Sequence, residues 1–477
     1  MTSILQQTSP VHPAGPRRAL RATHFPLGAA DRFDQGVRIV GGLAMWAGML
    51  VVSYWWIADR GVQDLLSLAS GLAATGRLSG LFSAQLLLVQ VLLMSRLPLL
   101  EQAYGRIRLA KIHRAVGLWS VWLMVTHIVM AVAGRASASL SGVLSALRKI
   151  LTDYPGVLLA AGGTVCLIMV VATSVRSARR KLRYESWHLL HLYGYLGAAM
   201  ALPHQLWAGD EFTSRPVATI YWWGLWGVTA VAVIIWRVLL PLAKTLRHRL
   251  RVFSVRWETH DVVSVTMTGR RLDRLPVRAG EFINVRFLTM PGWTRSNPFS
   301  LSAAPDGRTL RITARVVGDG TARLARLRPG TPVLFEGPYG RLSSRARTRS
   351  KVLLAGAGVG ITPLRALAEG LNYLPGNAVL LQRYADEPLF DREFEWLKQN
   401  RGLRAYYLSG RRPHPWSVLG PLPAGLEELD ALLAVVPDLA EYDVFLCGPD
   451  EWTKGMERLM SAGGVPADHV HAESFGW

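Results

Sequence analysis

The chain has 477 residues, 50% of them apolar and 18% charged, which excludes a disordered protein and is unusually apolar for a soluble enzyme. Its two cysteines, Cys166 and Cys447, exclude a disulfide framework and a CxxC metal site. The net charge is +21, and residues 1–250 hold 25 Lys and Arg against 9 Asp and Glu. A nucleic-acid binder would gather this charge on a folded basic domain, whereas here it lies in the most apolar half. The charge therefore indicates a lipid bilayer as partner and no nucleic acid.

Six apolar runs follow one another in the first half of the chain. They lie near residues 37–58, 79–98, 112–133, 156–175, 187–207 and 217–240. Each is close to the roughly 20 residues that a helix needs to cross a bilayer, and Trp and Tyr cluster at their ends. The pattern predicts a six-helix transmembrane bundle over residues 37–243, preceded by a tail over residues 1–36.

The basic residues predict the orientation of this bundle. The N-terminal tail and every second loop hold 19 Lys and Arg, whereas the alternate loops hold 6. By the positive-inside rule, the first set and both chain ends are cytoplasmic, in a multi-pass protein of the cell membrane. The tail has no small-residue cleavage site after a short apolar core, so it is not expected to be a secretory signal.

Five histidines stand out because they lie within apolar runs: His113 and His127 in the third run, and His188, His191 and His204 in the fifth. An ionisable side chain inside a membrane indicates function, because burying it is costly. The alternative is that each imidazole only hydrogen-bonds a neighbouring helix.

Helical spacing arranges these histidines at two levels. His113 and His127 are 14 residues apart, which returns them to within about 40° of one face, roughly 21 Å apart along the axis. His191 and His204 span roughly 20 Å. We therefore expect two stacked haems b, with His113 and His191 as metal ligands of one and His127 and His204 of the other. In an ideal helix His204 would lie about 140° from the face of His191 unless Gly and Pro residues bend that stretch, and His188 is the rival ligand.

From about residue 251 the pattern changes to short alternating strands broken by Gly and Pro. They are expected at Arg251–Trp257, Val262–Thr268, Phe282–Phe287, Leu310–Val317 and Val333–Glu336. Such short strands predict an antiparallel β-barrel over residues 251–345.

Residues 350–477 alternate between strands and helices. Strands are expected at Lys351–Ala355, Ala378–Tyr384, Leu403–Leu408 and Tyr442–Cys447, and helices at Thr362–Leu371, Asp391–Asn400, Leu426–Val435 and Glu451–Ser461. This alternation predicts an α/β doubly wound domain with a nucleotide crevice at the carboxyl ends of its strands.

A glycine-rich segment links the first expected strand and helix of this domain. It contains Gly356, Gly358, Gly360, Thr362 and Pro363. Glycines let the backbone approach a pyrophosphate, and the N-terminus of the following helix favours its negative charge. The spacing is G-x-G-x-G and not G-x-G-x-x-G, so an ordinary tight turn is the alternative.

Several ordered motifs resemble the ferredoxin–NADP reductase module, and in particular its version in NADPH oxidases and ferric reductases. They are Asn297-Pro-Phe-Ser-Leu-Ser-Ala-Ala-Pro305, Arg315-Val-Val-Gly318-Asp-Gly-Thr321, Glu336-Gly-Pro-Tyr-Gly340, the glycine loop, Cys447-Gly-Pro449 and the C-terminal E-x-F-x-aromatic. Together with the two histidine pairs, the resemblance covers residues 37 to 477. Asn297 departs from the family's Arg or His, and Gly320 stands where oxidases have Trp.

The resemblance implies a binding site for FAD and one for NADPH. The expected FAD residues are Asn297, Pro298, Phe299, Ser300, Ser302, Arg315, Gly318 and Thr321. Phe299 would offer a ring to the flavin, Ser300 a hydroxyl, and Arg315 and Thr321 would lie at the pyrophosphate. The nucleotide would bind at the glycine loop and at Cys447, Gly448 and Pro449. The expected catalytic residues are Ser300, Cys447, Glu473 and Trp477, and Trp477 or Phe475 would cover the flavin face.

The end of the third expected strand of the α/β domain favours NADPH over NADH. Ser409, Arg411 and Arg412 follow this strand, and Arg383 ends the previous one. In the similar reductases, Ser and Arg at this place hold the 2′-phosphate, and a guanidinium offers it a fork of donors. The alternative is that these arginines are only solvated.

These features predict a transmembrane flavocytochrome that moves electrons from cytoplasmic NADPH through FAD and two haems to an outside acceptor. The acceptor is either oxygen, giving superoxide, or a ferric chelate. No calcium-binding loop or partner-docking domain is evident, so no obligatory protein partner is expected. The alternatives are a flavin reductase anchored by a haem-free bundle, and a transporter whose histidines relay protons.

Overall fold

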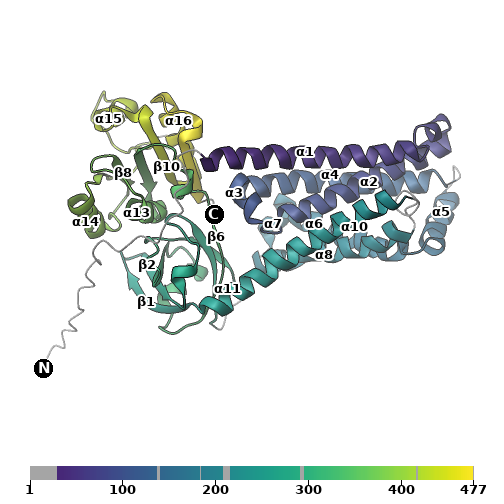
Figure 1. Cartoon of the computed structure of the whole chain (residues 1–477), viewed down its shortest axis with the longest axis horizontal. Coiled ribbons are helices and arrows are strands. Elements are labelled where there is room, and N and C mark those ends of the chain that lie inside the picture. Colours follow the sequence, from purple (N-terminus) through teal and green to yellow (C-terminus); the bar gives the residue numbers. More distant parts are fainter. Residues whose placement is uncertain are drawn as a thin grey trace. The chain divides into compact units, whose positions relative to one another are not determined.

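The computed structural model describes residues 29–136, 140–182, 184–207, 215–289, 295–414 and 417–475. Within this part the chain forms two compact units (Figure 1). One covers Asp31–Ala243, and the other covers Lys244–Trp477, of which the structure describes residues up to Phe475. The first unit is helical, and the second contains all the described strands.

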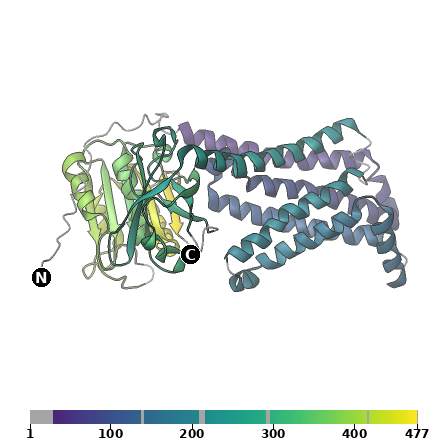
Figure 2. The same cartoon turned by 90° about the horizontal axis from the view of Figure 1, so that it is seen from below.

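The helical unit is a bundle in which long helices run alongside one another (Figure 2). Its helices are α1 Ala29–Ala58, α2 Leu68–Leu93, α3 Pro98–Tyr104, α4 Arg106–Ala133, α5 Leu140–Asp153, α6 Val157–Ser174, α7 Arg176–Lys181, α8 Tyr184–Trp207 and α10 Pro216–Ala232. The last helix continues through the π-helical segment η2 Val233–Leu239 into α11 Leu240–His248. Each of the six expected spans is a helix, whereas α3, α5 and α7 were not expected.

Five of these helices are long and apolar enough to cross a membrane. They are Arg32–Ala58, Leu68–Leu93, Arg108–Ala133, Val157–Ser174 and Pro216–His248. The remaining expected span, α8, has 24 residues and therefore the length, but it is not among the five. It carries His188, His191 and His204, whose polar rings lower its hydropathy. The chain is a multi-pass membrane protein, and α8, the fifth of the six expected spans, stays a prediction as a span.

Small residues let the helices pack in two close pairs, α2 with α4 and α6 with α8. A Cβ atom on Gly163 of α6 would lie 2.7 Å from the carbonyl oxygen of Gly197 on α8. Between α2 and α4, the hydroxyls of Ser83 and Ser120 each donate to the other's carbonyl oxygen, at 2.7 and 2.9 Å. Such close approaches are typical of membrane helices, which associate through packing and polar contacts.

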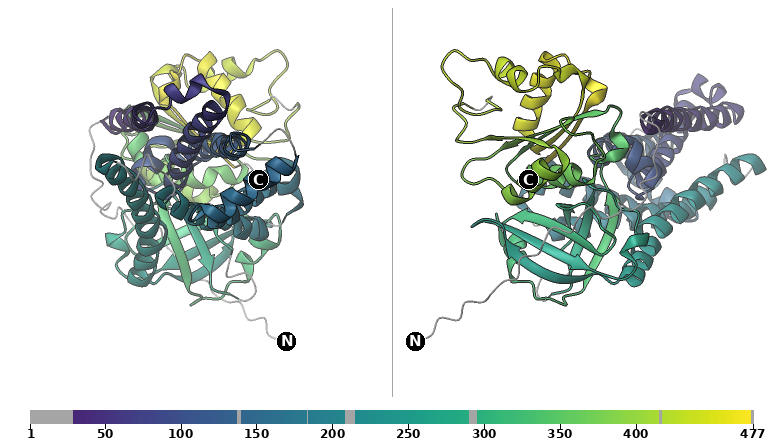
Figure 3. Two further views of the ribbon diagram at one scale, coloured as in Figure 1. Left: turned by 90° about the vertical axis from the view of Figure 1, so that its right-hand side faces the viewer. Right: turned by 60° about the vertical axis from the view of Figure 1, so that its left-hand side comes forward.

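The second unit begins with the expected antiparallel barrel, built from two three-stranded sheets (Figure 3). The order is β1-β2-β5 in one sheet and β4-β3-β6 in the other. The strands are β1 Arg251–Trp257, β2 Val262–Thr268, β3 Phe282–Phe287, β4 Asn297–Ser300, β5 Thr309–Arg315 and β6 Val333–Tyr339. β1, β2 and β3 have the expected bounds, and β4 was not expected as a strand.

The rest of the unit is a five-stranded parallel sheet in the order β11-β10-β7-β8-β9. Its strands are β7 Lys351–Ala357, β8 Ala378–Arg383, β9 Arg404–Leu408, β10 Tyr442–Pro449 and β11 Val470–Phe475. The helices are α13 Ile361–Gly370, α14 Asp391–Arg401, α15 Glu428–Val435 and α16 Asp450–Ala462. The chain runs outward from β7 through β8 to β9 and returns to the other side of β7 as β10. The expected doubly wound fold is confirmed, with its topological switch point between β7 and β10.

Candidate functional site

The structure places His113 on α4 close to His191 on α8. Their ring centroids are 6.0 Å apart and the ring planes cross at 63°. His127 also interacts electrostatically with His204, one turn before the end of α8. All four rings are half-buried. The bundle therefore brings together both histidine pairs that the sequence predicted, although α8 is a continuous helix with Pro203 inside it.

Backbone carbonyl groups of α2 fix the proton on both α4 histidines. Nδ1 of His113 lies 3.1 Å from the carbonyl oxygen of Gln90, and Nδ1 of His127 lies 2.8 Å from that of Gly76. A carbonyl oxygen only accepts, so each Nδ1 donates and each Nε2 keeps a lone pair. A histidine that ligates a metal through one nitrogen typically donates from the other in this way.

The α8 histidines are held less uniformly. Nδ1 of His191 lies 3.3 Å from the hydroxyl of Ser174. The buried Nδ1 of His204 makes no hydrogen bond of ordinary geometry among the described residues. Glycines allow the close packing around His127 and His204. A Cβ atom on Gly80 would lie 2.6 Å from Nδ1 of His127, and one on Gly156 would lie 2.7 Å from the backbone nitrogen of His204.

This donor set fits a haem better than a free metal ion. Among the described residues, no three His, Cys, Asp or Glu side chains gather as a chelating group. A porphyrin supplies four nitrogens of its own, so two facing imidazoles complete the coordination of its iron. The two histidine pairs meet this requirement without a third protein ligand.

The glycine loop lies at the topological switch point of the parallel sheet. It leaves β7 through η6 Gly358–Gly360 and enters α13 directly. A Cβ atom on Gly360 would lie 2.2 Å from the carbonyl oxygen of Cys447 on β10, so only glycine fits there. The hydroxyl of Thr362 donates to the carbonyl oxygen of Val359 at 2.9 Å, and Thr362 and Pro363 are buried. These contacts fix the conformation of the loop, and the N-terminus of α13 lies at its end.

The strands beside this loop bring the expected nicotinamide residues together. Cys447 pairs with Gly356 on one side and with Glu473 of β11 on the other, and Gly448 and Pro449 follow it. Burial raises the pKa of the Cys447 thiol well above its usual value, so the thiol stays neutral. A neutral thiol can position or pack against a ligand, but it is a poor nucleophile.

Glu473 joins the C-terminal strand to the barrel. Its Oε1 accepts a hydrogen bond from the backbone nitrogen of Arg341 at 2.9 Å, in the segment after β6. Burial raises the pKa of this carboxyl above its usual value, against the backbone hydrogen bonds that lower it. Phe475, the last described residue, is half-buried at the end of β11, and Trp477 lies outside the described residues.

The expected flavin stretch forms β4, at the edge of the second barrel sheet. Phe299 is 6% exposed and belongs to the hydrophobic core of the barrel. Its neighbour Ser300 is buried to the same degree, at 6% exposed. That Phe299 packs on the flavin stays a prediction. Asn297 and Pro298 begin the strand, and Ser300 pairs with Phe282 of β3.

Ser302, immediately after β4, takes part in a buried network that sequence reasoning missed. Its hydroxyl lies 2.7 Å from that of Thr313 and 3.2 Å from Nε of Arg311. Arg311 in turn makes a bidentate pair with Glu393 of α14, at 2.7 and 2.9 Å. Although burial opposes it, Arg311 and Arg365 hold the pKa of Glu393 below its usual value. The network joins the barrel to the α/β domain through groups 63 to 82 residues apart, which no local sequence signal could reveal.

The expected pyrophosphate residues lie at the end of β5. This strand lies beside the glycine-containing η6. Arg315 is exposed and its Nε donates to Asp261 at 2.5 Å, so its guanidinium is already engaged. The hydroxyl of Thr321 accepts from the backbone nitrogens of Val317 and Gly318 at 3.0 and 3.3 Å and closes a local turn.

The four expected 2′-phosphate residues lie at the carboxyl ends of β8 and β9. Ser409, Arg411 and Arg412 are exposed, whereas Arg383 is 6% exposed and donates to the carbonyl oxygen of Leu408 at 3.0 Å. Burial, and next the charge of Arg412, lower the pKa of Arg383. The structure thus gathers positive charge beside the nucleotide crevice.

Comparisons with known proteins agree with this two-part organisation. Residues 79–202 match the family described as "Ferric reductase like transmembrane component". The heavy chain of a superoxide-generating NADPH oxidase of Dictyostelium discoideum is 25% identical over 263 residues, 50% of this chain and 47% of that protein.

Two bacterial reductases are similar over a comparable length. The ferredoxin–NAD(+) reductase component of an alkene monooxygenase system of Xanthobacter autotrophicus is 31% identical over 245 residues, 48% of this chain and 70% of that protein. The glycine betaine monooxygenase reductase subunit of Chromohalobacter salexigens is 26% identical over 243 residues, 48% of this chain and 64% of that protein. The chain thus spans from about half to about two thirds of these relatives.

Proposed function

Because this chain belongs to the superfamily of ferric reductases and NADPH oxidases, with a reductase module like that of ferredoxin–NADP reductases, we propose that it carries electrons across a membrane. The donor is NADPH on the cytoplasmic side, and the acceptor outside is oxygen or a ferric chelate. Bound FAD and two haems would supply the redox chemistry, because nicotinamide transfers two electrons together whereas haem iron takes one.

The chain's own residues bind and orient these groups. The glycine loop leaves space for a pyrophosphate, and Arg411 and Arg412 offer donors to a 2′-phosphate. Glu473 fixes β11 to the barrel, so that the C-terminal strand stays next to the nucleotide crevice. His113 and His191 would hold one haem, and His127 and His204 the other.

The observation that carries the proposal is the hydrogen bonding of the two α4 histidines to main-chain carbonyl groups of α2. If the intramembrane histidines relayed protons, both ring nitrogens would need to exchange protons with neighbours. Here Nδ1 of His113 and of His127 donates to a main-chain carbonyl oxygen. A carbonyl oxygen accepts a hydrogen bond but does not take up or release a proton, so it cannot take part in a proton relay. Each ring presents only Nε2, as a metal ligand does.

A reduced-minus-oxidised spectrum of the purified full-length chain tests the proposal. We expect the sharp bands of low-spin bis-histidine haem after reduction by NADPH, and about two haems per chain by pyridine haemochrome. Re-oxidation after adding oxygen or ferric citrate then distinguishes the two acceptors. A purified chain with FAD and no haem would instead be an anchored flavin reductase, and one with neither cofactor would favour proton transport.

A further inference from the structure

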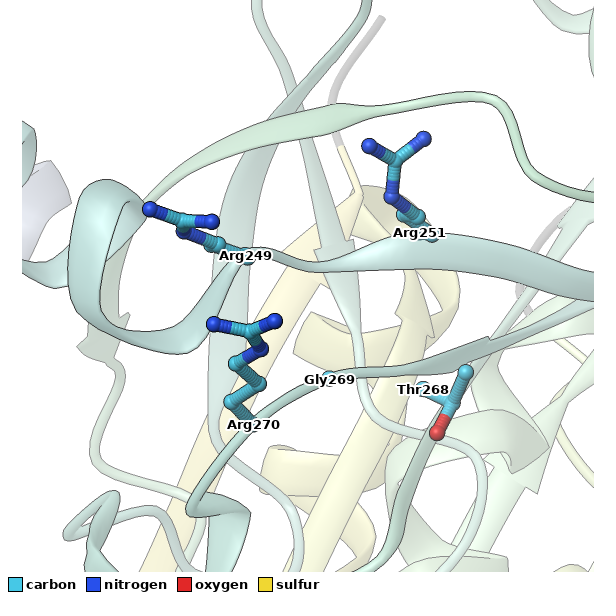
Figure 4. Close-up of a pocket in the computed structure, with 5 residues that line it drawn as sticks. All are labelled: Arg249, Arg251, Thr268, Gly269 and Arg270. Carbon is cyan, nitrogen blue, oxygen red and sulfur yellow. The ribbon is translucent and has the colours of Figure 1, made fainter.

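Three arginines line an open pocket of about 250 Å³ at one end of the barrel, together with Thr268 and Gly269 (Figure 4). Arg249 precedes β1, Arg251 begins it, and Arg270 follows β2. In Figure 4 the guanidinium of Arg270 extends toward Arg249. Among the described residues, none of the three forms an ion pair with a carboxylate. Their mutual repulsion favours an anion in the pocket.

The pocket is built on a rigid junction. The backbone nitrogen of Arg270 donates to the carbonyl oxygen of His248 at 2.6 Å, and Nδ1 of His248 donates to the carbonyl oxygen of Arg270 at 3.0 Å. His248 is 3% exposed. A Cβ atom on Gly269 would lie 2.6 Å from the same His248 oxygen, so only glycine allows this approach. The backbones of Arg249 and Arg270, which flank this junction, are therefore held at fixed positions.

Arg249 has a strained backbone. Its φ angle is 45°, in the left-handed region that residues with a Cβ atom avoid. Its side chain is anchored only by Nε, 3.3 Å from the carbonyl oxygen of Leu246. Strained residues of this kind persist where the surrounding structure fixes them, and they cluster at ligand sites.

The position of the pocket along the chain identifies the kind of anion. Helix Pro216–His248 is one of the five candidate spans, and Arg249 is the next residue. The apolar part of this helix ends at Ala243, so Arg249 lies six residues, or roughly 9 Å of helix, beyond it. Its long side chain can extend back toward the bilayer. The phosphate layer of a bilayer lies just outside its hydrocarbon core. We propose that Arg249, Arg251 and Arg270 bind the phosphate of an anionic phospholipid headgroup where the last span leaves the membrane.

Short-chain lipids test this on the purified full-length chain in detergent. We expect dioctanoyl phosphatidylglycerol to bind, with an affinity that falls as salt is raised, and dioctanoyl phosphatidylcholine to bind at least tenfold more weakly. The triple variant Arg249→Gln, Arg251→Gln, Arg270→Gln should lose at least tenfold in affinity for phosphatidylglycerol. Arg270→Gln alone should lose about fivefold, because each basic residue near such a surface contributes about that factor.

A matched variant separates the site from general charge. Arg308→Gln, Arg392→Gln and Arg458→Gln together remove the same charge from exposed positions elsewhere in the unit. This variant should keep the wild-type affinity within twofold. An equal loss in both triple variants would overturn the proposal, as would equal binding of phosphatidylcholine. Inorganic phosphate that bound as tightly as phosphatidylglycerol would make the pocket a free-anion site and would also overturn it.

Discussion

At the scale of single residues, the histidine pairs make the sharpest prediction. His127→Ala or His204→Ala should each leave about one haem per chain, because each removes one of the two ligands proposed at that level. Flavin content and flavin reduction by NADPH should stay unchanged, since both depend on the other unit. Pyridine haemochrome assays measure the haem, and His188→Ala is the control that should keep both haems. Two haems in both alanine variants would refute the ligand assignment.

The residues of the site differ in how far the sequence could predict them. Helical periodicity is local, so the spacing of His113 and His127 is enough to indicate their common face. The burial of Phe299 in the barrel core could not be predicted, because β4 has only four residues and is too short to show alternation. The Arg311–Glu393 pair could not be predicted, since its partners lie on elements whose contact arises only in the folded unit.

Glu281 gives a residue-scale prediction on pH. It is 7% exposed, and burial raises its pKa to about 7, with Arg278 opposing the shift and Glu473 adding to it. Lys244 is the other nearby charge. Between pH about 4.5 and 7 the folded chain keeps a proton that the unfolded chain has released, so stability falls as pH rises through this range. Glu281→Gln should remove that fall, a gain of about 2–4 kcal/mol above pH 7.

Thermal unfolding of the full-length chain at pH 5.0 and 7.5 measures this effect. The Tm difference between Glu281→Gln and wild type should grow in favour of the variant at the higher pH. The amide can still accept from the backbone nitrogen of Arg278, as the carboxylate does at 2.8 Å. Parallel pH profiles for the two proteins would show that Glu281 titrates normally.

We expect side chains at the ends of β8 and β9 to decide the preference between NADPH and NADH. Arg411→Ala with Arg412→Ala should raise the KM for NADPH about ten- to a hundredfold, because charge-assisted contacts contribute about 1.5–3 kcal/mol. The KM for NADH should hardly change, since NADH has no 2′-phosphate. Arg392→Ala with Arg458→Ala is the control of equal charge. A wild-type chain that prefers NADH, or an equal loss with both nucleotides, would contradict the assignment.

At the scale of elements, the glycine loop is the most constrained connection. A methyl group in Gly360→Ala would lie 2.2 Å from the carbonyl oxygen of Cys447 and 2.8 Å from Cα of Gly448. Backbone atoms cannot yield as a flexible side chain can, so the loop must move away from β10. We expect at least tenfold weaker binding of NADP+ in equilibrium titrations, with FAD content unchanged. Gly227→Ala on α10, where a Cβ atom would have nothing within 4 Å, is the control that should bind normally.

Most elements with a clear period were predicted, with the exception of the amphipathic helix α5 of 14 residues, and short edge strands were not. β1, β2 and β3 have seven, seven and six residues, and each begins and ends where the alternation indicated. β4 has four residues with a proline inside, and β11 carries His, Glu and Ser, so neither shows an apolar period. Both are edge strands whose partners, not their own propensity, decide their conformation.

At the scale of the whole molecule, α8 decides the topology. Five spans would place the N-terminal tail and the reductase module on opposite sides of the membrane, whereas six place them on the same side. α8 is the least apolar of the six, yet it carries the ligands proposed for both haems. Its polar rings are acceptable inside a bilayer if they face a cofactor and not lipid. We therefore expect a chain that binds both haems to have an even number of spans.

The positive-inside pattern then predicts that both chain ends are cytoplasmic. The predicted cytoplasmic segments hold 19 Lys and Arg and the others 6. In inside-out vesicles, protease should remove both an N-terminal and a C-terminal epitope tag, and added NADPH, which does not cross membranes, should reduce the flavin. In sealed right-side-out vesicles neither should occur, and a tag inserted directly after Ala136, beyond the end of α4, should be cleaved instead. Tags cleaved on opposite sides would mean an odd number of spans, with α8 not crossing the membrane. His204 could then not face His127 inside the bilayer, and the second haem site would be refuted.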